Sequence, residues 1–572
     1  MKILLCAVNA KYIHTNIALR CIKKYCSSKI SSELILKEYT INNYLQDIVD
    51  DIYKAHPDIV SFSVYIWNKE ITAKASVLLK LLLPDIKIVF GGPEVSYNPH
   101  DVMESIPECD YIISGEGEIT SEYLYRALET GESIDDIKGV TYRIKNNIIT
   151  NPPREPMNMG DIPFPYSDFS EISNKICYYE ASRGCPFNCQ YCLSSIEKGV
   201  RFVPLEKVKK DLKIFIDHKV KQVKFVDRTF NANKNFAKEI ITFIIESDNN
   251  ITNFHFEVAA ELMNDELIEL LGSARKGLFQ LEIGVQSTNP NTLTEISRNG
   301  DFNKITETVT KIQAYKNIHI HLDLIAGLPY EDINSFKKSF NDVHSLFPNQ
   351  LQLGFLKVLH GSGMEKIVKE HEIKYSPYIP YEVLSTKYLS FDDVLFLKDI
   401  EEMTETYYNS RRFINSLRYL YMHSDSYFDT YEKLAETKST EFIDNITHNK
   451  NDTYEFLLKS LSRFKDADAD VFKWLLKFDY ILHEKPKGNP DWTRSCQNML
   501  DKNGIYDIIV RNNSLTKFYP ELIKYDPKEI LNFSHAEKFP LDPVSLKIKN
   551  TTILINYKKR NTDGNAEYVI ID

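Results

Sequence analysis

Short β-branched runs alternate with segments of helical period along the first 130 residues, and this alternation restricts the possible folds more than any other feature. We expect strands in ILLCAV, ELILKEY, DIVSFSV, IKIVFGG and YIIS, and helices near residues 16–25, 41–55, 69–82 and 118–129. Strands that alternate with helices form parallel sheets, because each helix carries the chain back to the same edge. The pattern therefore predicts an α/β fold with a doubly wound parallel sheet, which binds ligands at the carboxyl ends of its strands.

A second alternating region follows a proline-rich stretch, with expected strands in CYYEAS, QVKFV, FHFEV, FQLEI, HLDLIAG and LQLGFL. Six strands with helices between them predict a partial or complete β/α barrel. After about residue 370 the pattern becomes mostly helical and ends in an expected hairpin, TTILINYKK with AEYVIID. We therefore divide the chain into a doubly wound domain (1–135), a linker (136–168), a β/α barrel (169–368) and a mostly helical C-terminal domain (369–572).

Nine cysteines are present, and three of them fall within the window CPFNCQYC at Cys185, Cys189 and Cys192. An odd number in a chain of 572 residues is not typical of a disulfide framework. The chain has no apolar run near the roughly 18 residues of a spanning helix, and its start lacks the pattern of a secretory signal. We expect a protein of the reducing cytoplasm without membrane contact. The net charge of −10 gives no overall electrostatic footprint for nucleic acid, so we do not expect that partner.

The spacing of the three cysteines allows their thiolates to converge from one loop onto one metal centre. Iron–sulfur clusters usually have four cysteine ligands, so three ligands would leave one iron of a 4Fe-4S cluster open to a chelating molecule. A zinc site completed by a remote histidine or cysteine fits the spacing as well. Buried cysteines without a chemical role are the third interpretation. The spacing favours the cluster.

The window also resembles the signature of the radical S-adenosylmethionine (radical SAM) superfamily, including Tyr191 before the last cysteine. The resemblance implies that Cys185, Cys189 and Cys192 hold a 4Fe-4S cluster whose open iron binds S-adenosylmethionine. Electron transfer then cleaves this cofactor to a 5′-deoxyadenosyl radical. The electron donor would be of the flavodoxin or ferredoxin type.

Polar residues after the later strands resemble the cofactor contacts of the same superfamily. By this resemblance Asp227 in VDRTFN, Glu257 in FEVAAELM and Gln286 in EIGVQS contact the amino group and ribose of S-adenosylmethionine. Arg298 in ISRNG would bind its carboxylate. Each of these residues is equally well read as a buried polar group or a helix cap.

The first domain resembles the cobalamin-binding flavodoxin-like fold, in which a serine segment and a later Gly-Gly line the slot for the nucleotide tail. Ser61 and Ser63 end the third expected strand, and Gly91 and Gly92 follow the fourth. His14 lies in the first loop, but the aspartate and glycine that accompany a cobalt-ligating histidine are missing from NAKYIHTNIA. Because a ligating histidine needs an acceptor that orients it, we do not expect His14 to bind cobalt.

The order of these parts resembles the cobalamin-dependent radical SAM class. We therefore expect an enzyme that methylates an unactivated carbon. The alternatives are a radical SAM oxidoreductase, cyclase or other enzyme that does not methylate, and a cobalamin or redox sensor without enzymatic activity. The C-terminal third resembles a family without a settled role. Within it Arg411 and Arg412 form either an anion clamp or a solvated helix face.

Overall fold

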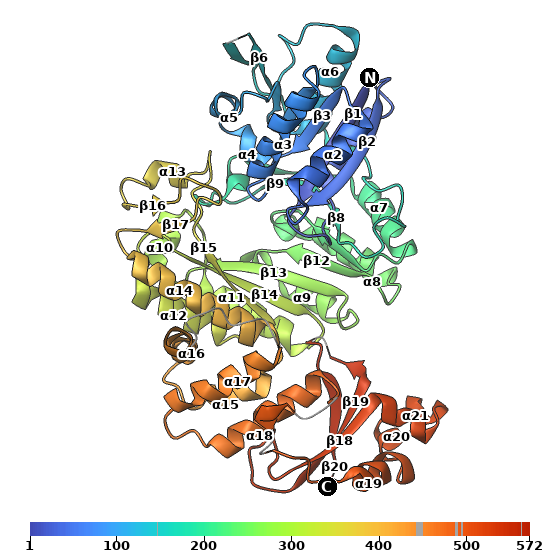
Figure 1. Cartoon of the computed structure of the whole chain (residues 1–572), viewed down its shortest axis with the longest axis vertical. Coiled ribbons are helices and arrows are strands. Elements are labelled where there is room, and N and C mark those ends of the chain that lie inside the picture. The colour runs from blue at the N-terminus through green and yellow to red at the C-terminus, as the bar shows by residue number, and fades with distance from the viewer. Residues whose placement is uncertain (146, 442–449, 487–489, 494–495, 562, 572) are drawn as a thin grey trace. The chain divides into compact units, whose positions relative to one another are not determined.

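A computed structural model describes residues 1–572 except 146, 442–449, 487–489, 494–495, 562 and 572 (Figure 1). The chain divides into two compact units. Unit 1 contains Met1–Gly284, Pro290–Ile318 and Phe355–Lys387, and unit 2 contains Val285–Asn289, His319–Gly354 and Tyr388–Asp572.

A seven-stranded sheet lies in the N-terminal part of unit 1, with the order β2-β1-β3-β4-β5-β6-β7. The first five strands are parallel, and β6 and β7 join antiparallel. The order 2-1-3-4-5 is that of flavodoxin-like sheets, so the predicted fold class is confirmed. The strands are β1 (Lys2–Asn9), β2 (Glu33–Thr40), β3 (Ile59–Ser63), β4 (Lys87–Gly91), β5 (Tyr111–Ile113), β6 (Val140–Ile144) and β7 (Asn147–Thr150).

Helices cover both faces of this sheet, because successive residues of a central strand point to opposite sides. Leu4 and Val8 of β1 pack with residues of α2 and α3, whereas Ile3 and Ala7 pack with residues of α1 and α6. These helices are α1 (Ile17–Cys26), α2 (Leu45–Ala55), α3 (Lys69–Leu82) and α6 (Gly117–Thr130). Two short helices that the pattern did not predict, α4 (Pro93–Ser96) and α5 (Pro99–Ser105), follow β4.

The segment expected to be a linker from residue 136 begins instead as part of the sheet. The β6–β7 hairpin extends the sheet beyond β5, and the proline-rich segment starts only after β7. The first domain therefore continues past the expected boundary at residue 135. β7 has four largely exposed residues, so it offers no apolar run by which a strand is recognised.

The second α/β region contains four parallel strands in the order β13-β12-β11-β8. They are β8 (Cys177–Tyr179), β11 (Gln222–Phe225), β12 (Asn253–Glu257) and β13 (Phe279–Gln286). They belong to unit 1 except for the last two residues of β13, Val285 and Gln286. The helices of this region are α7 (Leu205–Asp217), α8 (Lys234–Glu246), α9 (Asp265–Gly272), α10 (Pro290–Glu295) and α11 (Phe302–Ala314). An antiparallel ribbon of β9 (Ser182–Cys185) and β10 (Gly199–Phe202) follows β8. The last segment of unit 1 contains α13 (Met364–Ile367), β16 (Lys374–Tyr375) and β17 (Val383–Ser385).

Unit 2 contains the remaining two predicted strands, which are neighbours in a sheet. They are β14 (His319–Ala326) and β15 (Gln350–Phe355), joined through α12 (Ile333–His344). Helices then dominate, as expected. They include α14 (Phe391–Met403), the π-helix η5 (Thr404–Asn409), α15 (Ile414–Tyr421), α16 (Tyr427–Glu441), α17 (Lys450–Ser460) and α18 (Ala469–His483).

The chain ends in a three-stranded antiparallel sheet of β18 (Ser534–Phe539), β19 (Thr551–Arg560) and β20 (Ala566–Ile571). The expected hairpin is its β19–β20 pair, and β18 is additional. Residues of α18 pack on one face of this sheet, and the short helices α19 (Lys502–Tyr506), α20 (Ser514–Phe518) and α21 (Pro527–Ile530) lie on the other (Figure 1). Among the described helices, none is both long enough and apolar enough to span a bilayer.

Candidate functional site

Cys185 ends β9, and Cys189 and Cys192 lie in the loop between β9 and β10; residues 185–192 are called the cysteine loop below. Cys189 is buried, Cys185 and Cys192 are partly exposed, and all three are free thiols. The amide of Cys192 donates to the carbonyl oxygen of Cys189 at 3.1 Å, which closes a turn. The hydroxyl of Ser195 donates to the carbonyl oxygens of Cys189 and Cys192 at 2.9 and 2.7 Å. The loop is therefore ordered by its own hydrogen bonds.

Glycine is required where the ribbon enters this loop. Gly184 has a φ of +94°, and a Cβ atom there would lie 2.1 Å from the carbonyl oxygen of Gly199. The loop is also tied to two later segments of unit 1. The amide of Gln190 donates to the carbonyl oxygen of Ile296 at 2.9 Å, and its carbonyl oxygen accepts from the amide of Met364 at 3.0 Å. These contacts fix the backbone between the first and last cysteine.

Arg298 is the charged side chain in contact with the cysteine loop. Its Nη1 donates to Tyr191 Oη at 3.0 Å and to Cys189 Sγ at 3.7 Å, and its Nη2 donates to the carbonyl oxygen of Gly284. Burial raises the pKa of the Cys189 thiol, and the Arg298 charge opposes this rise. The Nε of Arg298 is buried and has no hydrogen-bond partner among the described residues. A buried donor without a protein partner is expected to meet a ligand.

The other residues predicted to contact S-adenosylmethionine, Asp227, Glu257 and Gln286, lie at three different places in the structure. Asp227 is buried, and its carboxylate accepts from the amide of Ala181 at 2.9 Å and the hydroxyl of Ser182 at 2.5 Å. Burial raises the pKa of Asp227 to about 7. Asp227 therefore supports the start of β9. Glu257 ends β12 in unit 1, whereas Gln286 ends β13 with a φ of +71° and belongs to unit 2.

The predicted slot residues of the first sheet lie at the carboxyl ends of β3 and β4. Ser61 accepts a hydrogen bond from Tyr125 Oη, and Ser63 accepts one from Asn16 Nδ2, both at 2.8 Å. A Cβ atom at Gly91 would meet no atom closer than 3.6 Å. The protein's own atoms therefore do not require a glycine at position 91. We infer that the glycine is there because a ligand approaches the backbone closely.

Gly92 differs from its neighbour because the protein requires a glycine there. Its φ is +119°, and a Cβ atom would lie 2.5 Å from the carbonyl oxygen of Val64. An aromatic pair, Tyr65 and Trp67, follows Val64. The rings of Tyr65 and Trp67 stack with centroids 4.5 Å apart, and Trp67 Nε1 donates to the carbonyl oxygen of Val8 at 3.1 Å.

His14 has a protein partner at one ring nitrogen. Its Nδ1 lies 2.7 Å from Tyr178 Oη, and burial together with Lys11 and Lys224 lowers its pKa. The tyrosine hydroxyl orients the His14 ring. A hydroxyl thus stands where a cobalt-ligating histidine would have the carboxylate of an aspartate, the residue that the loop lacks.

Sequence reasoning missed a buried ionic cluster around Arg183, two residues before Cys185. Arg183 pairs with Glu118 at 2.5 Å, Glu180 at 2.9 Å and Glu116 at 3.4 Å. Arg201 of β10 also pairs with Glu116. Glu116 and Glu118 belong to SGEGEIT after β5, and Glu180 directly follows β8, so acidic residues after two strand ends were the available signal. Because such residues are usually solvated, the pattern alone did not single out the cluster.

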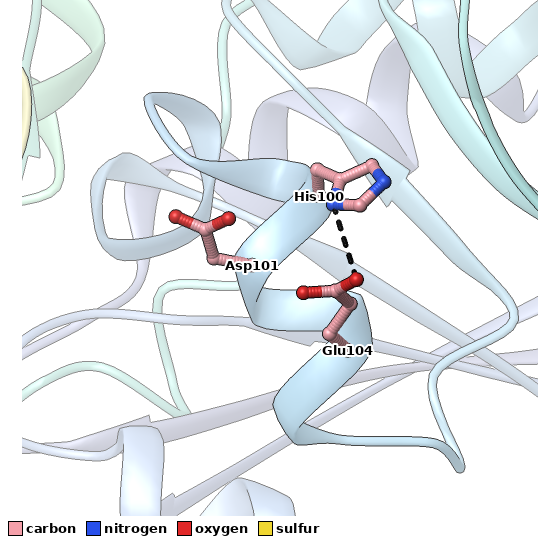
Figure 2. A group of neighbouring side chains, drawn as sticks. All are labelled: His100, Asp101 and Glu104. Atoms are coloured by element: carbon pink, nitrogen blue, oxygen red, sulfur yellow. Dashed lines mark ion pairs between the residues drawn. The ribbon is translucent and has the colours of Figure 1, made fainter.

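One group of potential metal ligands lies on the short helix α5, where Figure 2 shows His100, Asp101 and Glu104. His100 Nδ1 and Glu104 Oε1 are 3.8 Å apart, and both side chains are more than half exposed. An exposed pair at positions i and i+4 is a common feature of helix surfaces. We assign no metal site to these residues.

Family models match three consecutive parts of the chain. The B12 binding domain matches residues 3–124, and the radical SAM superfamily matches residues 179–343. A protein family of unknown function (DUF4080) matches residues 369–558. The radical SAM superfamily implies S-adenosylmethionine with an iron–sulfur cluster, and the B12 binding domain implies cobalamin.

Several known proteins are similar to the chain. The uncharacterized methyltransferase PH0819 of Pyrococcus horikoshii is 27% identical over 303 residues, which cover 50% of this chain and 63% of that protein. The cobalamin-dependent radical SAM methyltransferase TokK of Streptomyces tokunonensis is 26% identical, over 51% of this chain and 45% of TokK. The chain thus spans less than two thirds of each relative's length.

A solved structure with a similar fold is that of the cobalamin-dependent S-adenosylmethionine radical enzyme OxsB with aqua-cobalamin and S-adenosylmethionine bound. Its TM-score is 0.55 at 15% identity, and the match covers 84% of this chain and 79% of OxsB. At this identity the similarity concerns the fold alone.

The side chains of the site fit the cofactors of the matched families. Three free thiols on one ordered loop are the donor set of a cluster with an open iron. The unpartnered Nε of Arg298 is next to this loop and suits a carboxylate ligand. At the first sheet, Gly91 has no side chain although a Cβ atom would make only ordinary contacts with Ile113, which fits the close approach of a cofactor tail to the backbone.

Proposed function

Because the chain belongs to the radical SAM superfamily and carries a B12 binding domain, we propose that it is a cobalamin-dependent methyltransferase acting on an unactivated carbon. When bound, S-adenosylmethionine and a 4Fe-4S cluster supply a 5′-deoxyadenosyl radical that removes hydrogen, and cobalamin supplies the methyl group. Two relatives whose names describe methyltransferases support this proposal.

The contact of Arg298 with the cysteine loop is the observation that carries the proposal. The thiolates of Cys185, Cys189 and Cys192 hold the cluster, and Arg298 Nε binds the carboxylate of S-adenosylmethionine. The bonds of Nη1 and Nη2 to Tyr191 and Gly284 fix the guanidinium plane, so that Nε keeps one direction. A fixed donor lowers the entropy that is lost when the cofactor binds.

Polar groups at the strand ends complete the cofactor contacts in this proposal. Glu257, which ends β12 in the same unit as Arg298, contacts the amino group or ribose of S-adenosylmethionine. Ser61 and Ser63, with the backbone at Gly91 and Gly92, line the slot for the cobalamin tail. The pairing of His14 with Tyr178 supports cobalamin binding without a histidine ligand.

The proposed location is the cytoplasm, where a flavodoxin or ferredoxin type of protein supplies the electron. Partly exposed Cys185 and Cys192 support electron entry from an external donor, because a fully enclosed cluster would lengthen the electron-transfer path.

Anaerobic reconstitution with iron, sulfide, cobalamin and dithionite tests the radical step. We expect 5′-deoxyadenosine from the wild type and none from Cys189→Ala. Cys177→Ala is the matched control, because Cys177 is a fully buried cysteine of strand β8 outside the loop. A wild type that loads the cluster and binds S-adenosylmethionine but never cleaves it would overturn the proposal.

The ratio of products then separates methyl transfer from other radical outcomes. Methyl transfer consumes one S-adenosylmethionine for the radical and one to restore methylcobalamin, so 5′-deoxyadenosine and S-adenosylhomocysteine should form in equal amounts with substrate. A cyclase or oxidoreductase would form 5′-deoxyadenosine alone. The anaerobic magnesium-protoporphyrin IX monomethyl ester cyclase of Synechocystis, 27% identical over 245 residues, makes this comparison necessary.

A further inference from the structure

A cavity of about 790 Å³ lies within unit 2, in the part matched by the family of unknown function and in α12 beside it. It is formed by the end of α12, the π-helix η5, the helix α15 and the segment leading into α16. Ligand sites in proteins typically have volumes between roughly 300 and 1,000 Å³. None of the residues that line it belongs to the cysteine loop or to the slot of the first sheet.

Aromatic rings form much of the cavity wall. Tyr407 and Tyr408 come from the π-helix, an irregularity that is frequent at functional sites. Tyr427 packs edge-on against Tyr421 and Phe347, with ring centroids 5.2 and 5.4 Å apart. These ring contacts hold the wall in one arrangement, so an aromatic ligand finds a preformed surface.

Hydrogen bonds behind this wall fix it further. Tyr421 Oη lies 2.6 Å from Tyr431 Oη, and both hydroxyls lie 3.1 Å from Nε2 of His344. The His344 ring also stacks on Tyr427 with centroids 4.5 Å apart. Burial lowers the pKa of His344 to about 3, so the ring behind the wall is neutral.

Arg411 is held in the cavity in an unfavourable backbone conformation. Its φ is +55°, a region that residues other than glycine adopt at a cost. The carbonyl oxygen of Arg411 accepts from Asn565 Nδ2 at 2.9 Å, and its Nε pairs with Asp563 Oδ1 at 3.1 Å. Bonds from two residues of the last hairpin thus hold the strained residue and orient its guanidinium. Such strain is maintained where a side chain must point in one direction.

Four charged residues line the cavity, namely Asp342, Asp425, Arg411 and Arg418, and Asp425 is exposed to solvent. Asp342 is paired with Lys338 at 2.5 Å and accepts from the hydroxyl of Thr288 at 2.6 Å. Arg418 is exposed, and its Nη2 donates to the carbonyl oxygens of Pro543 and Val544. The bond to Asp563 uses Nε of Arg411, and the opposite edge of a guanidinium carries the donors that pair with a carboxylate.

We propose that this cavity binds a planar aromatic small molecule with one carboxylate, whose rings pack between the tyrosines and whose carboxylate pairs with Arg411. Tyrosine rings suit aromatic ligands because the faces and edges of π-systems attract each other in offset and edge-on arrangements. The residues that line this site are separate from the proposed cofactor contacts.

Calorimetric titration of the full chain with 2-naphthoate and 2-naphthamide tests the proposal. The two probes have the same rings and differ in charge. We expect the carboxylate to bind at least about tenfold more tightly, because a guanidinium–carboxylate pair in a half-buried site is stronger than an amide contact. Equal affinities, or no binding of the carboxylate up to about 5 mM, would overturn the proposal.

Two variants assign the binding to this cavity. Arg411→Met should lower the affinity for the carboxylate at least about tenfold, whereas Arg412→Met should leave it unchanged, because Arg412 does not line the cavity. Ile414→Trp keeps Arg411 and fills the space, and it should abolish binding of both probes. Retention of carboxylate affinity in Ile414→Trp, or equal losses in the two arginine variants, would contradict the assignment even if one variant folds poorly.

Discussion

Replacement of Gly92 by alanine is the sharpest test of how the first sheet forms its ligand edge. Gly92 has φ +119° and ψ 172°, a region open essentially to glycine alone. An alanine Cβ would lie 2.5 Å from the oxygen and 3.1 Å from the nitrogen of Val64. Both are backbone atoms and cannot rotate away. Gly92→Ala must therefore move the chain after β3 or the chain after β4.

The magnitude follows from two costs. The strained backbone costs about 1 to 3 kcal/mol, and the displaced contact costs about 1 to 3 kcal/mol more. Movement of Val64 also weakens its hydrogen bonds to Gly91 at 2.7 Å and from Glu94 at 3.4 Å. We expect Gly92→Ala to lower the local stability of this edge by about 3 kcal/mol or more. Gly115→Ala is the control, because Gly115 has φ +78° with no atom within 4 Å of a Cβ, and it should cost about 1 kcal/mol.

Hydrogen exchange followed by mass spectrometry measures this difference on the full chain. Peptides that cover β3 and β4 should exchange faster in Gly92→Ala than in the wild type, with little change in the C-terminal sheet. Bound cobalamin should be lost in parallel. Equal protection in the two glycine variants, or normal protection in Gly92→Ala, would refute the reasoning about the contact with Val64.

Three further predictions concern single residues. Gly91→Ala should keep the exchange protection of β3 and β4 but reduce bound cobalamin measured by the corrin absorption, because only a ligand needs the space; full loading would contradict this. Glu331 is buried with a pKa raised to about 7, and its Oε2 has no partner among the described residues. Relative to Glu331→Gln, the wild type should lose about 3 kcal/mol of unfolding free energy as the pH rises from about 4.5 to above 7. The reason is that in this pH range the carboxyl group of Glu331 stays protonated in the folded state and ionises in the unfolded state. A pH-independent difference between the two proteins in denaturant titrations would refute the prediction. Lys477→Met removes the ammonium partner of the buried Glu537, which keeps only its contact with His535 at 2.7 Å, and should cost up to about 3 to 5 kcal/mol in the same titrations. Lys473→Met, at a partly exposed lysine paired with the exposed Asp470, should cost less than about 1 kcal/mol.

The sequence was sufficient for elements whose pattern is local. In β1 every residue from Ile3 to Val8 is buried, and such an apolar run marks a central strand whatever surrounds it. The helix α3 was predicted with its observed ends, because its period and its flanking residues are both local. The β6–β7 hairpin escaped detection because β7 is short and exposed and is held by pairing to β6.

The cavity of unit 2 could not be derived from the sequence because its main features depend on distant partners. The letters YYNSRRF fit an ordinary helix as well as a π-helix followed by a residue with positive φ. What decides between them is the contact of Arg411 with Asp563 and Asn565, more than 150 residues later. Sequence analysis kept the anion clamp and the solvated helix face as alternatives for Arg411 and Arg412. In the structure Arg411 lines the cavity and Arg412 does not.

In the cysteine loop, too, some properties depend on the local sequence and others depend on distant contacts. A motif therefore predicts ligands but not their reactivity. The spacing of Cys185, Cys189 and Cys192 predicts the ligands of the proposed cluster, because three thiols in one short segment can converge on one metal centre. The spacing says nothing about the guanidinium of Arg298, which contacts Cys189 from 109 residues away and opposes the rise of its pKa through burial. A second chain with the same CPFNCQYC window but a neutral residue at this position would keep the ligand set and lose both the charge next to Cys189 and the donor to an incoming carboxylate. Local sequence thus predicts which atoms would bind the proposed cluster, and long-range packing determines the electrostatic environment of Cys189.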